Sequence, residues 1–506
     1  YNKYVTFAMS AVHNLLTAYE ENPEAFGDNF GIPESQNGHP DILDEVKWEL
    51  DWLLKMIDSE TGLTHIKMGS ISYEDNALAP PSVNADPRYY GPTCTSATIA
   101  NAFMLAKAAI VYQNEIGWET YAETLESAAV LSWNAVLPYL ENNELENDCD
   151  DGSIISGDAD WSIDFQCEQA IATAAVLFQL TEEEEYNNYV VTHQNDISLL
   201  DDNYWGPEIM NVKDALLDYA QNPMSDSELS NDLLTGFTET VQNNWNQLYG
   251  EVDNDLYMAY MPDWSYHWGS NMPKAMTGVL NLLINQSEID QNNADYYQNR
   301  AEDHLHYFHG VNPNDLVYLS NMYSYGAEHC VNEIYHTWFH DGSEWDNALA
   351  SLYGPPPGFV SGGPNNNFTV ESLSPPFGQP AQKSYLDFND NWPNNSWEIS
   401  EPAIYYQAAY IRLLAAFVSS SDVPDNIAKA EEFLNWKWYP NPGATQLKST
   451  SSQSLEVVIR NALGQNIWTG VLPHGSSIAT DNWASGLYFI RSKSNSTVQS
   501  SVWIKN

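Results

Sequence analysis

The sequence predicts a mainly α-helical domain, built as a toroid or a superhelix, followed by a small β-sandwich. Apolar residues recur at helical spacing in roughly ten to twelve segments over the first four-fifths of the chain. No fixed short repeat accompanies these segments, which argues against a regular solenoid. After about residue 420 the pattern changes to alternating apolar and polar residues with glycine turns, which is typical of short strands.

The helical part opens with an amphipathic segment in which Val5, Met9 and Val12 share one face. The next segment begins at Pro40 with acidic residues behind it, and both features suit a helix N-terminus. Loops rich in Asn, Pro, Gly and aromatic residues join the helices, and such long loops are usually functional. Helices are expected at 2–20, 40–57, 95–113, 118–140, 165–181, 211–221, 227–247, 273–285, 293–309 and 402–418.

The end of the chain differs from the rest in pattern and in charge. The stretch SSSDVP is typical of a linker, and we expect a helical domain over 1–418, a linker over 419–438 and a β-sandwich over 439–506. Strands are expected in LEVVIRNALGQNIW, GLYFIRS and TVQSSVWIKN. The sandwich region carries a net charge of +3, which leaves −54 for the remainder out of a total of −51.

The acidity of the chain restricts its partners. With 69 acidic and 18 basic residues, the chain has few cationic groups for binding phosphate, so nucleic acid and anionic membrane surfaces are excluded as partners. A neutral partner fits better, and 18 Trp, 31 Tyr and 16 Phe favour one with flat apolar faces. An acidic, soluble surface is the plainer explanation of the charge.

No targeting or membrane segment is visible in the sequence. No run of eighteen or more apolar residues occurs, so no transmembrane helix is expected. The chain starts at Tyr1 without a basic segment and an apolar segment behind it, so no signal peptide is expected either. We expect that processing or incomplete sequencing has removed the start.

The four cysteines show no metal-ligand spacing. They are Cys94, Cys149, Cys167 and Cys330, and no CxxC pair occurs among them. Over a chain of 506 residues they cannot form a disulfide framework, although one bridge is compatible with the sequence.

Five motifs include the long loops and parts of the neighbouring helices: FGIPESQNGHPDILDEVKWELDWLLKM (30–56), YHWGSN (266–271), HYFHGVNP (306–313), GPPPGFVSGGPN (354–365) and YLDFNDNWPNNSWEISEP (385–402). In this order they resemble glycoside hydrolase family 9, the inverting β-1,4-glucanases with an (α/α)6 barrel. The resemblance covers almost all of residues 1–418. It implies a secreted or cell-surface endoglucanase that acts on cellulose or a related β-glucan. The tail, with YPNP and the closing WIKN, resembles a C-terminal sorting domain of the type IX secretion system, which implies contact with that machinery.

Two glutamates stand three positions apart in SWEISEPAIYYQAAY (396–410). Pro402 suits the first position of the following helix, which places Glu401 at the mouth of that helix. The helix dipole there favours a charged carboxylate, and a plain acidic N-cap residue is the alternative reading of Glu401. The resemblance implies instead that Glu401 is the general acid, and Glu398 is expected to lie at the surface or to brace the loop.

Inverting hydrolysis needs one carboxylic acid to protonate the leaving oxygen and one carboxylate to activate water, roughly 6.5–9.5 Å apart. To act as an acid near neutral pH, Glu401 must be desolvated. Trp397, Tyr405 and Tyr406 are expected to form its apolar wall.

The resemblance implies further site residues. Asp387 matches an aspartate that orients the acid or a sugar hydroxyl, with an Asx-turn brace as the alternative. His336, in NEIYHTWF, falls where the family binds sugar hydroxyls, although Trp338 stands where the family has arginine. A buried core histidine is the alternative for His336. The expected platforms for sugar rings are Trp268, Trp338, Tyr323 and Trp392, and core packing is the alternative for each.

No cofactor is expected, and no metal ligands are assigned. Family members commonly carry structural calcium held by an Asp-Glu pair, and the nearest equivalent here is Cys167–Glu168. Sulfur in place of a carboxylate oxygen disfavours calcium. The acidic loop ENDCDDGS (146–153) is another candidate, with a solvated run of charge as its alternative.

The general base of the family is an aspartate in a DAGD motif directly before residues that resemble YNKYV. The chain begins YNKYV and contains no later DAGD, so the base is expected before Tyr1 and the sequence is expected to be N-terminally incomplete. Without the base, activity should fall, because positioned base catalysis is worth about 10²–10⁴. The alternatives are a non-catalytic glucan-binding protein with the same cleft and a polysaccharide lyase. The scarcity of basic residues argues against the anionic substrate of a lyase.

Overall fold

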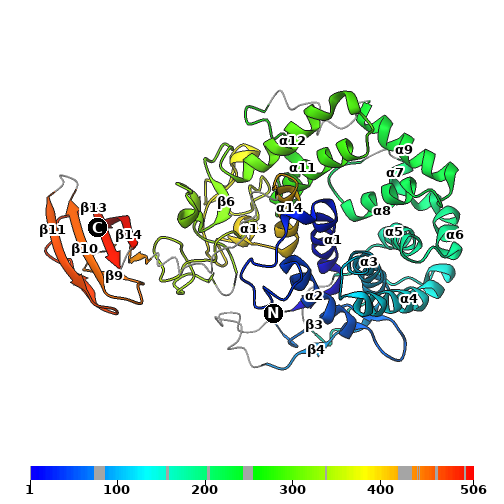
Figure 1. Ribbon diagram of the computed structural model, residues 1–506, viewed down its shortest axis with the longest axis horizontal. Coiled ribbons are helices and arrows are strands. Elements are labelled where there is room, and N and C mark those ends of the chain that lie inside the picture. Colours follow the sequence, from blue (N-terminus) through cyan, green and yellow to red (C-terminus); the bar gives the residue numbers. More distant parts are fainter. Residues whose placement is uncertain are drawn as a thin grey trace. The chain divides into compact units, whose positions relative to one another are not determined.

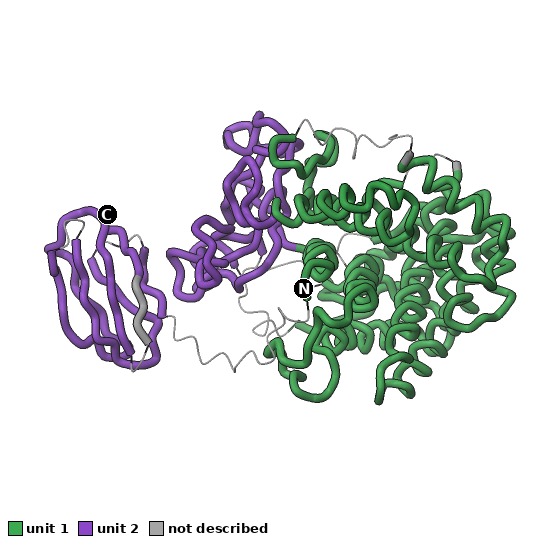
Figure 2. The backbone as a smooth tube through the Cα atoms, turned by 45° about the horizontal axis from the view of Figure 1, so that its top comes forward, with its two compact units in different colours: residues 1–76, 81–307, 403–424 green, residues 77–80, 308–402, 425–506 purple. Residues whose placement is uncertain are grey.

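The structure is a computed structural model, and it describes residues 2–72, 86–154, 159–201, 205–242, 255–336, 339–419, 436–441, 443, 445–461, 465–494 and 497–505. The chain forms two compact units (Figure 2). Unit 1 comprises residues 1–76, 81–307 and 403–424. Unit 2 comprises residues 77–80, 308–402 and 425–506. The domain boundaries predicted from the sequence remain a prediction.

Unit 1 is helical. Six of the buried helices form an inner layer: α1 (Val5–Glu21), α3 (Thr95–Tyr112), α5 (Ile163–Thr181), α8 (Met210–Gln221), α11 (Asn271–Gln286) and α14 (Ile404–Ala415). The others are α2 (Asp41–Leu53), α4 (Glu119–Asn142), α6 (Glu184–Thr192), α7 (Ser198–Asp201), α9 (Ser227–Gln242) and α12 (Ala294–Phe308).

The buried helices of unit 1 form the inner wall of a ring (Figure 1). Helix α1 contacts α3 and α14, α3 contacts α5, α5 contacts α8, and α11 contacts α14. Outside them, α2 packs on α1, α4 on α3, α6 on α5 and α9 on α8. Hydrophobic faces of paired helices are thereby covered on both sides, so the predicted α/α toroid is confirmed.

Helix α3 is the most apolar element in the described part of the chain. It is long and apolar enough to cross a membrane, yet all of its residues are buried inside unit 1. A central helix that is covered by α1, α4 and α5 has no polar face to present.

A buried ion network joins the last helix of the ring to the first. Arg412 on α14 lies 2.6 Å from Asp214 Oδ2 on α8 and 2.6 Å from Glu21 Oε1 on α1. His13 Nε2 on α1 lies 2.7 Å from the same Asp214 oxygen. Burial raises the pKa of Asp214, but Arg412 and His13 outweigh it and hold that pKa below its usual range. The ring therefore closes through charges as well as through apolar packing.

Short strands and one disulfide hold the loops of unit 1. β1 (Lys3–Tyr4), β3 (Lys67–Gly69) and β4 (Tyr89–Tyr90) form an antiparallel sheet, and β2 (Thr64–His65) pairs with β5 (Thr93–Cys94). Cys94, directly before α3, forms a disulfide with Cys149, while Cys167 and Cys330 are free. One disulfide was compatible with the sequence, and the structure places it between Cys94 and Cys149.

Residues 308–402 of unit 2 are mostly loops around little regular structure. β6 (Val317–Ser320) runs parallel to β7 (Cys330–Val331), and α13 (Trp397–Ser400) is a single turn. Backbone hydrogen bonds join three separate segments there: Tyr335 N–H donates to Ser400 O at 3.2 Å, and Gly363 N–H donates to Ile399 O at 3.0 Å.

The tail of unit 2 is the predicted β-sandwich. β11 (Asn466–Leu472), β10 (Leu455–Asn461), β13 (Gly486–Ser494) and β14 (Thr497–Lys505) form one antiparallel sheet in that order. β12 (Ser477–Ala479), β9 (Gln446–Ser449) and β8 (Trp438–Tyr439) form the other sheet. Alternate residues such as Val457, Ile459, Tyr488 and Ile490 face a core that also contains Trp503.

Several sequence-based boundaries need correction. The helix expected at 402–418 begins at Ile404, with Ala403 as its extended N-cap, so Pro402 is not its first residue. Helices α6, α7 and α13 were not predicted, and the last two are single turns that are too short to show a periodicity. The end of the helix expected at 227–247 and most of the expected linker 419–438 lie outside the described residues.

Candidate active site

Glu401 lies in a tight junction of three loop segments in unit 2. It is the C-cap residue of α13, is partly buried and has an extended backbone. A side chain at Gly362 would come within 2.7 Å of Ile399 O and 3.2 Å of Glu401 O, so glycine is required for this close approach. The backbone next to Glu401 is therefore hydrogen-bonded to residue 335 and to residue 363, and it packs closely against Gly362.

Tyr335 is the neighbour of Glu401 that the sequence analysis did not single out. Burial raises the pKa of its phenol, and the Glu401 carboxylate raises that pKa further. The backbone N–H of Tyr335 donates to Ser400 O at 3.2 Å, so the segments that carry Tyr335 and Glu401 lie side by side. Tyr335 directly precedes His336 in the motif NEIYHTWF. Its position next to an expected site histidine could have marked it as a candidate site residue.

Glu398 has a different environment from Glu401. Its side chain is buried, and Oε1 accepts hydrogen bonds from Thr369 Oγ1 at 2.5 Å and Asn395 Nδ2 at 3.0 Å. Oε2 accepts from Thr369 N–H at 2.9 Å. These contacts fit the bracing role expected of Glu398.

Asp387 is joined to Tyr323 through Asn332. Asp387 Oδ2 accepts from Asn332 N–H at 2.7 Å and from Asn332 Nδ2 at 3.0 Å, and Oδ1 accepts from Glu333 N–H at 3.2 Å. The Tyr323 hydroxyl donates to Asn332 Oδ1 at 2.7 Å. Burial raises the pKa of Asp387 to about 6 against the opposing effect of these donors. The carboxylate thus holds the 332–333 backbone across a separation of 55 residues.

His336 lies four residues beyond Asn332 on the same segment. Its side chain is partly buried, and burial lowers its pKa to about 4. At neutral pH the imidazole is therefore uncharged and can both donate and accept one hydrogen bond. A neutral histidine suits hydrogen bonding to sugar hydroxyls and does not supply the positive charge of the arginine missing at position 338.

Glu333 is a second carboxyl group on this segment that the sequence analysis missed. Burial raises its pKa to about 7, and the nearby carboxyl groups of Asp346 and Asp387 add to that effect. Asn347 Nδ2 donates to Glu333 Oε1. No spacing rule pointed to Glu333, because its acidic neighbours come from distant parts of the chain.

The expected aromatic platforms have different environments. Trp392 is 85% exposed on its loop, and Tyr323 is partly buried with its hydroxyl engaged. Trp268 belongs to unit 1, where its ring meets Tyr406 edge-on at 6.0 Å. Trp338 lies outside the described residues. Trp397, expected beside Glu401, is 41% exposed at the start of α13.

The residues at the expected calcium position do not fit that ion. Cys167 contributes sulfur, and Glu168 Oε1 accepts from Ser198 N–H at 3.0 Å and from Ser198 Oγ at 2.6 Å. Among the described residues, one group of three potential metal ligands lies close together, namely Cys94, Cys149 and Asp160. Two of these are joined in the disulfide, so this group does not suit a hard cation either.

Comparison with known families identifies both parts of the chain. Residues 1–414 match the model described as "Glycosyl hydrolase family 9". Residues 437–506 match the "Secretion system C-terminal sorting domain".

The relatives are distant in sequence and alike in fold. A cellulose 1,4-beta-cellobiosidase of Acetivibrio thermocellus is 25% identical over 433 residues, which are 78% of this chain and 46% of that protein. A xyloglucan-specific endo-beta-1,4-glucanase of Bacteroides ovatus is 23% identical and covers 82% of this chain and 67% of that protein. The structure of AaCel9A in complex with cellobiose-like isofagomine aligns with a TM-score of 0.67 at 21% identity, over 82% of this chain and 73% of that one. The chain spans between 46% and 60% of the length of the first three curated relatives.

Proposed function

The chain belongs to glycosyl hydrolase family 9, and on that basis we propose that it hydrolyses internal β-1,4-glucosidic bonds of cellulose or a related β-glucan. The proposed mechanism is inverting, with Glu401 as the general acid. The C-terminal sorting domain makes it an extracellular or cell-surface protein. Two carboxyl groups and a water molecule suffice for this chemistry, so the proposal includes no cofactor.

The contrast between Glu398 and Glu401 carries the assignment of the acid. A general acid must hold a proton and then release it to the leaving oxygen, so its charged form cannot be strongly favoured beforehand. Three donors hold the Glu398 carboxyl group inside the loop. Glu401 is only partly buried, at the C-cap of α13 and next to the segment that carries Tyr335, and this supports its role as the acid.

Asp387 and His336 act in this proposal as positioning and binding groups. The three hydrogen bonds to Asp387 fix the segment that carries Tyr335 and His336. His336 is neutral at neutral pH, so its imidazole carries one donor and one acceptor and suits binding to a sugar hydroxyl. Trp268, Trp338, Tyr323 and Trp392 remain the proposed platforms for pyranose faces.

The activating carboxylate for water is proposed to be the aspartate of a DAGD motif that falls before Tyr1. Hydrolysis of carboxymethyl-cellulose by the 506-residue chain is compared with that by a chain extended upstream through this motif. The extended form should be faster by about 10²–10⁴. Equal rates would show that the base has been placed wrongly. Binding of glucan by both forms without any release of reducing sugar would favour the alternative, a non-catalytic glucan-binding protein.

Matched substitutions test the acid in whichever form is active. Glu401→Gln should lower turnover of cellulose by about 10²–10⁴ with little change in oligosaccharide affinity. It should lower turnover of 2,4-dinitrophenyl β-cellobioside much less, because that leaving group needs no proton. Glu398→Gln is the control and should lower thermal stability while the folded enzyme keeps its turnover. The reverse pattern would make Glu398 the acid.

A further inference from the structure

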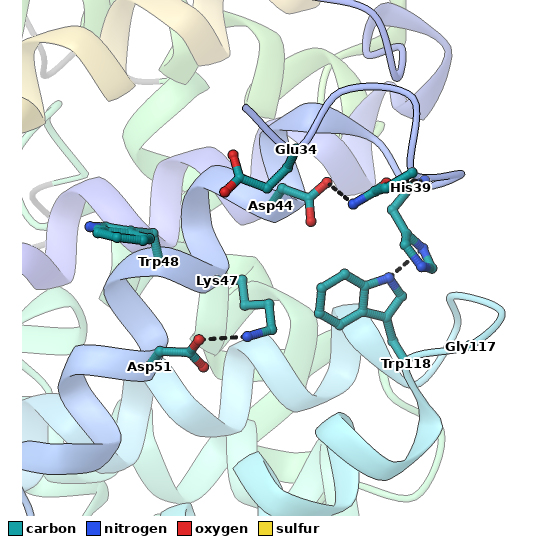
Figure 3. Close-up of a pocket in the computed structure, with 9 residues that line it drawn as sticks. Glu34, His39, Asp44, Lys47, Trp48, Asp51, Gly117 and Trp118 are labelled. Atoms are coloured by element: carbon teal, nitrogen blue, oxygen red, sulfur yellow. Dashed lines mark hydrogen bonds and ion pairs between the residues drawn. The ribbon is translucent and has the colours of Figure 1, made fainter. Parts of the chain in front are cut away.

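A pocket in unit 1 is built entirely from residues outside the candidate active site. It has a volume of about 560 Å³, within the usual range for small-molecule sites. Three segments line it: the loop before α2 with Glu34 and His39, the outer side of α2 with Lys47 and Trp48, and the turn before α4 with Trp118. Figure 3 shows the indole rings of Trp48 and Trp118 on opposite sides of the open space.

The two tryptophans differ in how they are held. Trp118 is buried, its indole N–H donates to His39 Nδ1, and its ring meets Tyr112 edge-on at 5.1 Å. Trp48 is 72% exposed on the same helix on which Trp52 is buried. The ring of Trp118 is therefore fixed by its protein contacts, whereas the ring of Trp48 is exposed to water at the pocket.

Polar groups occupy the walls between the tryptophans. Lys47 Nζ lies 2.5 Å from Asp51 Oδ2 and 4.6 Å from the centre of the Tyr121 ring. Asn37 Nδ2 donates to Asp44 Oδ2 at 3.0 Å. Donors and acceptors thus alternate around the hollow, and their mutual contacts fix their directions before any ligand arrives.

The chemistry of the lining restricts the ligand. Glu34, Asp44 and Asp51 outnumber the single ammonium group of Lys47, so phosphates and uronates would be repelled. No group of three metal-ligating side chains within reach of one ion occurs here among the described residues, which argues against a divalent cation. A lipid chain would leave the carboxylates and the ammonium group of the lining without polar partners. A neutral ring with one apolar face and several hydroxyls suits both the indoles and the carboxylates.

We propose that this pocket binds a glucosyl unit of the β-glucan as a second, non-catalytic site, and this rests on the proposed function. Trp48 would stack on the face of the pyranose ring, and the carboxylates and His39 would bind its hydroxyls. A glucan chain bound in this pocket stays near the enzyme between cleavage events. The pocket thereby raises the local concentration of polysaccharide without taking part in catalysis.

Substitution of Trp48 tests the site. Retention of Trp48→Ala on phosphoric-acid-swollen cellulose should fall about tenfold, which is the effect of losing one stacking contact. Its turnover of soluble cellohexaose should stay within about twofold of wild type, and Trp48→Phe should keep most of the retention. Ile116→Ala is the control, because Ile116 is 90% exposed beside Gly117 but does not line the pocket.

The outcomes separate the pocket from the active site. Loss of retention with unchanged cellohexaose turnover supports the second site. Retention by Trp48→Ala equal to that of Ile116→Ala, in an enzyme that still cleaves cellohexaose, overturns the second site and leaves the proposed function standing. A wild-type chain that neither binds cellulose nor, when extended through the DAGD motif, cleaves cellohexaose overturns both.

Discussion

Replacing Arg412 tests whether the ring of helices is closed by charge. The side chain of Arg412 is 1% exposed and pairs with Asp214 and Glu21, while its Nη1 also lies 3.2 Å from Asn14 Oδ1. In Arg412→Met the side chain of Asp214, 6% exposed, loses its guanidinium partner and keeps the contact with His13, whose pKa burial lowers. Removing one partner of a buried ion pair costs about 3–5 kcal/mol, because the other charge stays buried without compensation.

The expected loss is large enough to measure by thermal unfolding. At about 2 °C for each kcal/mol in a large domain, Arg412→Met should lower the melting temperature of unit 1 by about 6–10 °C. Arg300→Met is the matched control. Arg300 pairs with Asp303 three residues away at 2.7 Å, and these side chains are 11% and 27% exposed against 1% and 6% for Arg412 and Asp214, so the loss should be smaller.

The pH dependence identifies the mechanism. The folded pKa of Asp214 is held below its ordinary value, so the stabilisation is present above the ordinary carboxyl pKa and is lost as pH falls towards the folded value. The difference between wild type and Arg412→Met should therefore be full at pH 5–8 and shrink under strong acid. The double variant Arg412→Met, Asp214→Asn should lose less than the single one. A melting temperature of Arg412→Met equal to that of Arg300→Met would refute this reasoning.

Two further predictions concern a buried histidine and a site tyrosine. Burial lowers the pKa of His304 to about 4, so between pH 6.5 and 4 the unfolded state binds more protons and the free energy of unfolding should fall by about 3 kcal/mol on acidification. In chemical denaturation, the free energy of unfolding of His304→Gln should fall on acidification by about 3 kcal/mol less than that of the wild type. The same pH profile in both proteins would contradict the prediction. Tyr323→Phe removes the hydroxyl that donates to Asn332 and should reduce turnover roughly fivefold, for about 1 kcal/mol. Tyr325→Phe, at a position 71% exposed, is its control and should change nothing; equal effects of the two would refute the positioning role of Tyr323.

The inner helices were the most predictable part of this protein. The segment expected at 95–113 is α3 at Thr95–Tyr112, and the one expected at 211–221 is α8 at Met210–Gln221. Their long apolar patterns reflect burial on most sides, so local sequence and tertiary packing agree. Single turns such as α13 could not be predicted in this way, because four residues are too few to show a helical period.

The contacts that organise the active-site loops could not be predicted, because each joins residues far apart in the sequence. Thr369 lies 29 residues before Glu398, and Asn332 lies 55 residues before Asp387. Motifs marked these loops as functional but did not say which carboxylates are engaged by donors. The pocket at Trp48 was not predicted either. The amphipathic pattern around 40–57 does not show that Trp48 is exposed and Trp52 is buried.

Two acidic groups of the site are each held by several donors from distant segments. Glu398 and Asp387 each accept three hydrogen bonds from the protein. Burial raises the pKa of Asp387, yet its three donors still require the ionised form at working pH. Both groups therefore suit the loop-holding role that the proposal gives them. Of the three carboxyl groups of YLDFNDNWPNNSWEISEP that the motif resemblance marked, Glu401 lies outside these two sets of loop contacts, at the C-cap of α13, and the proposal gives it the role of the acid.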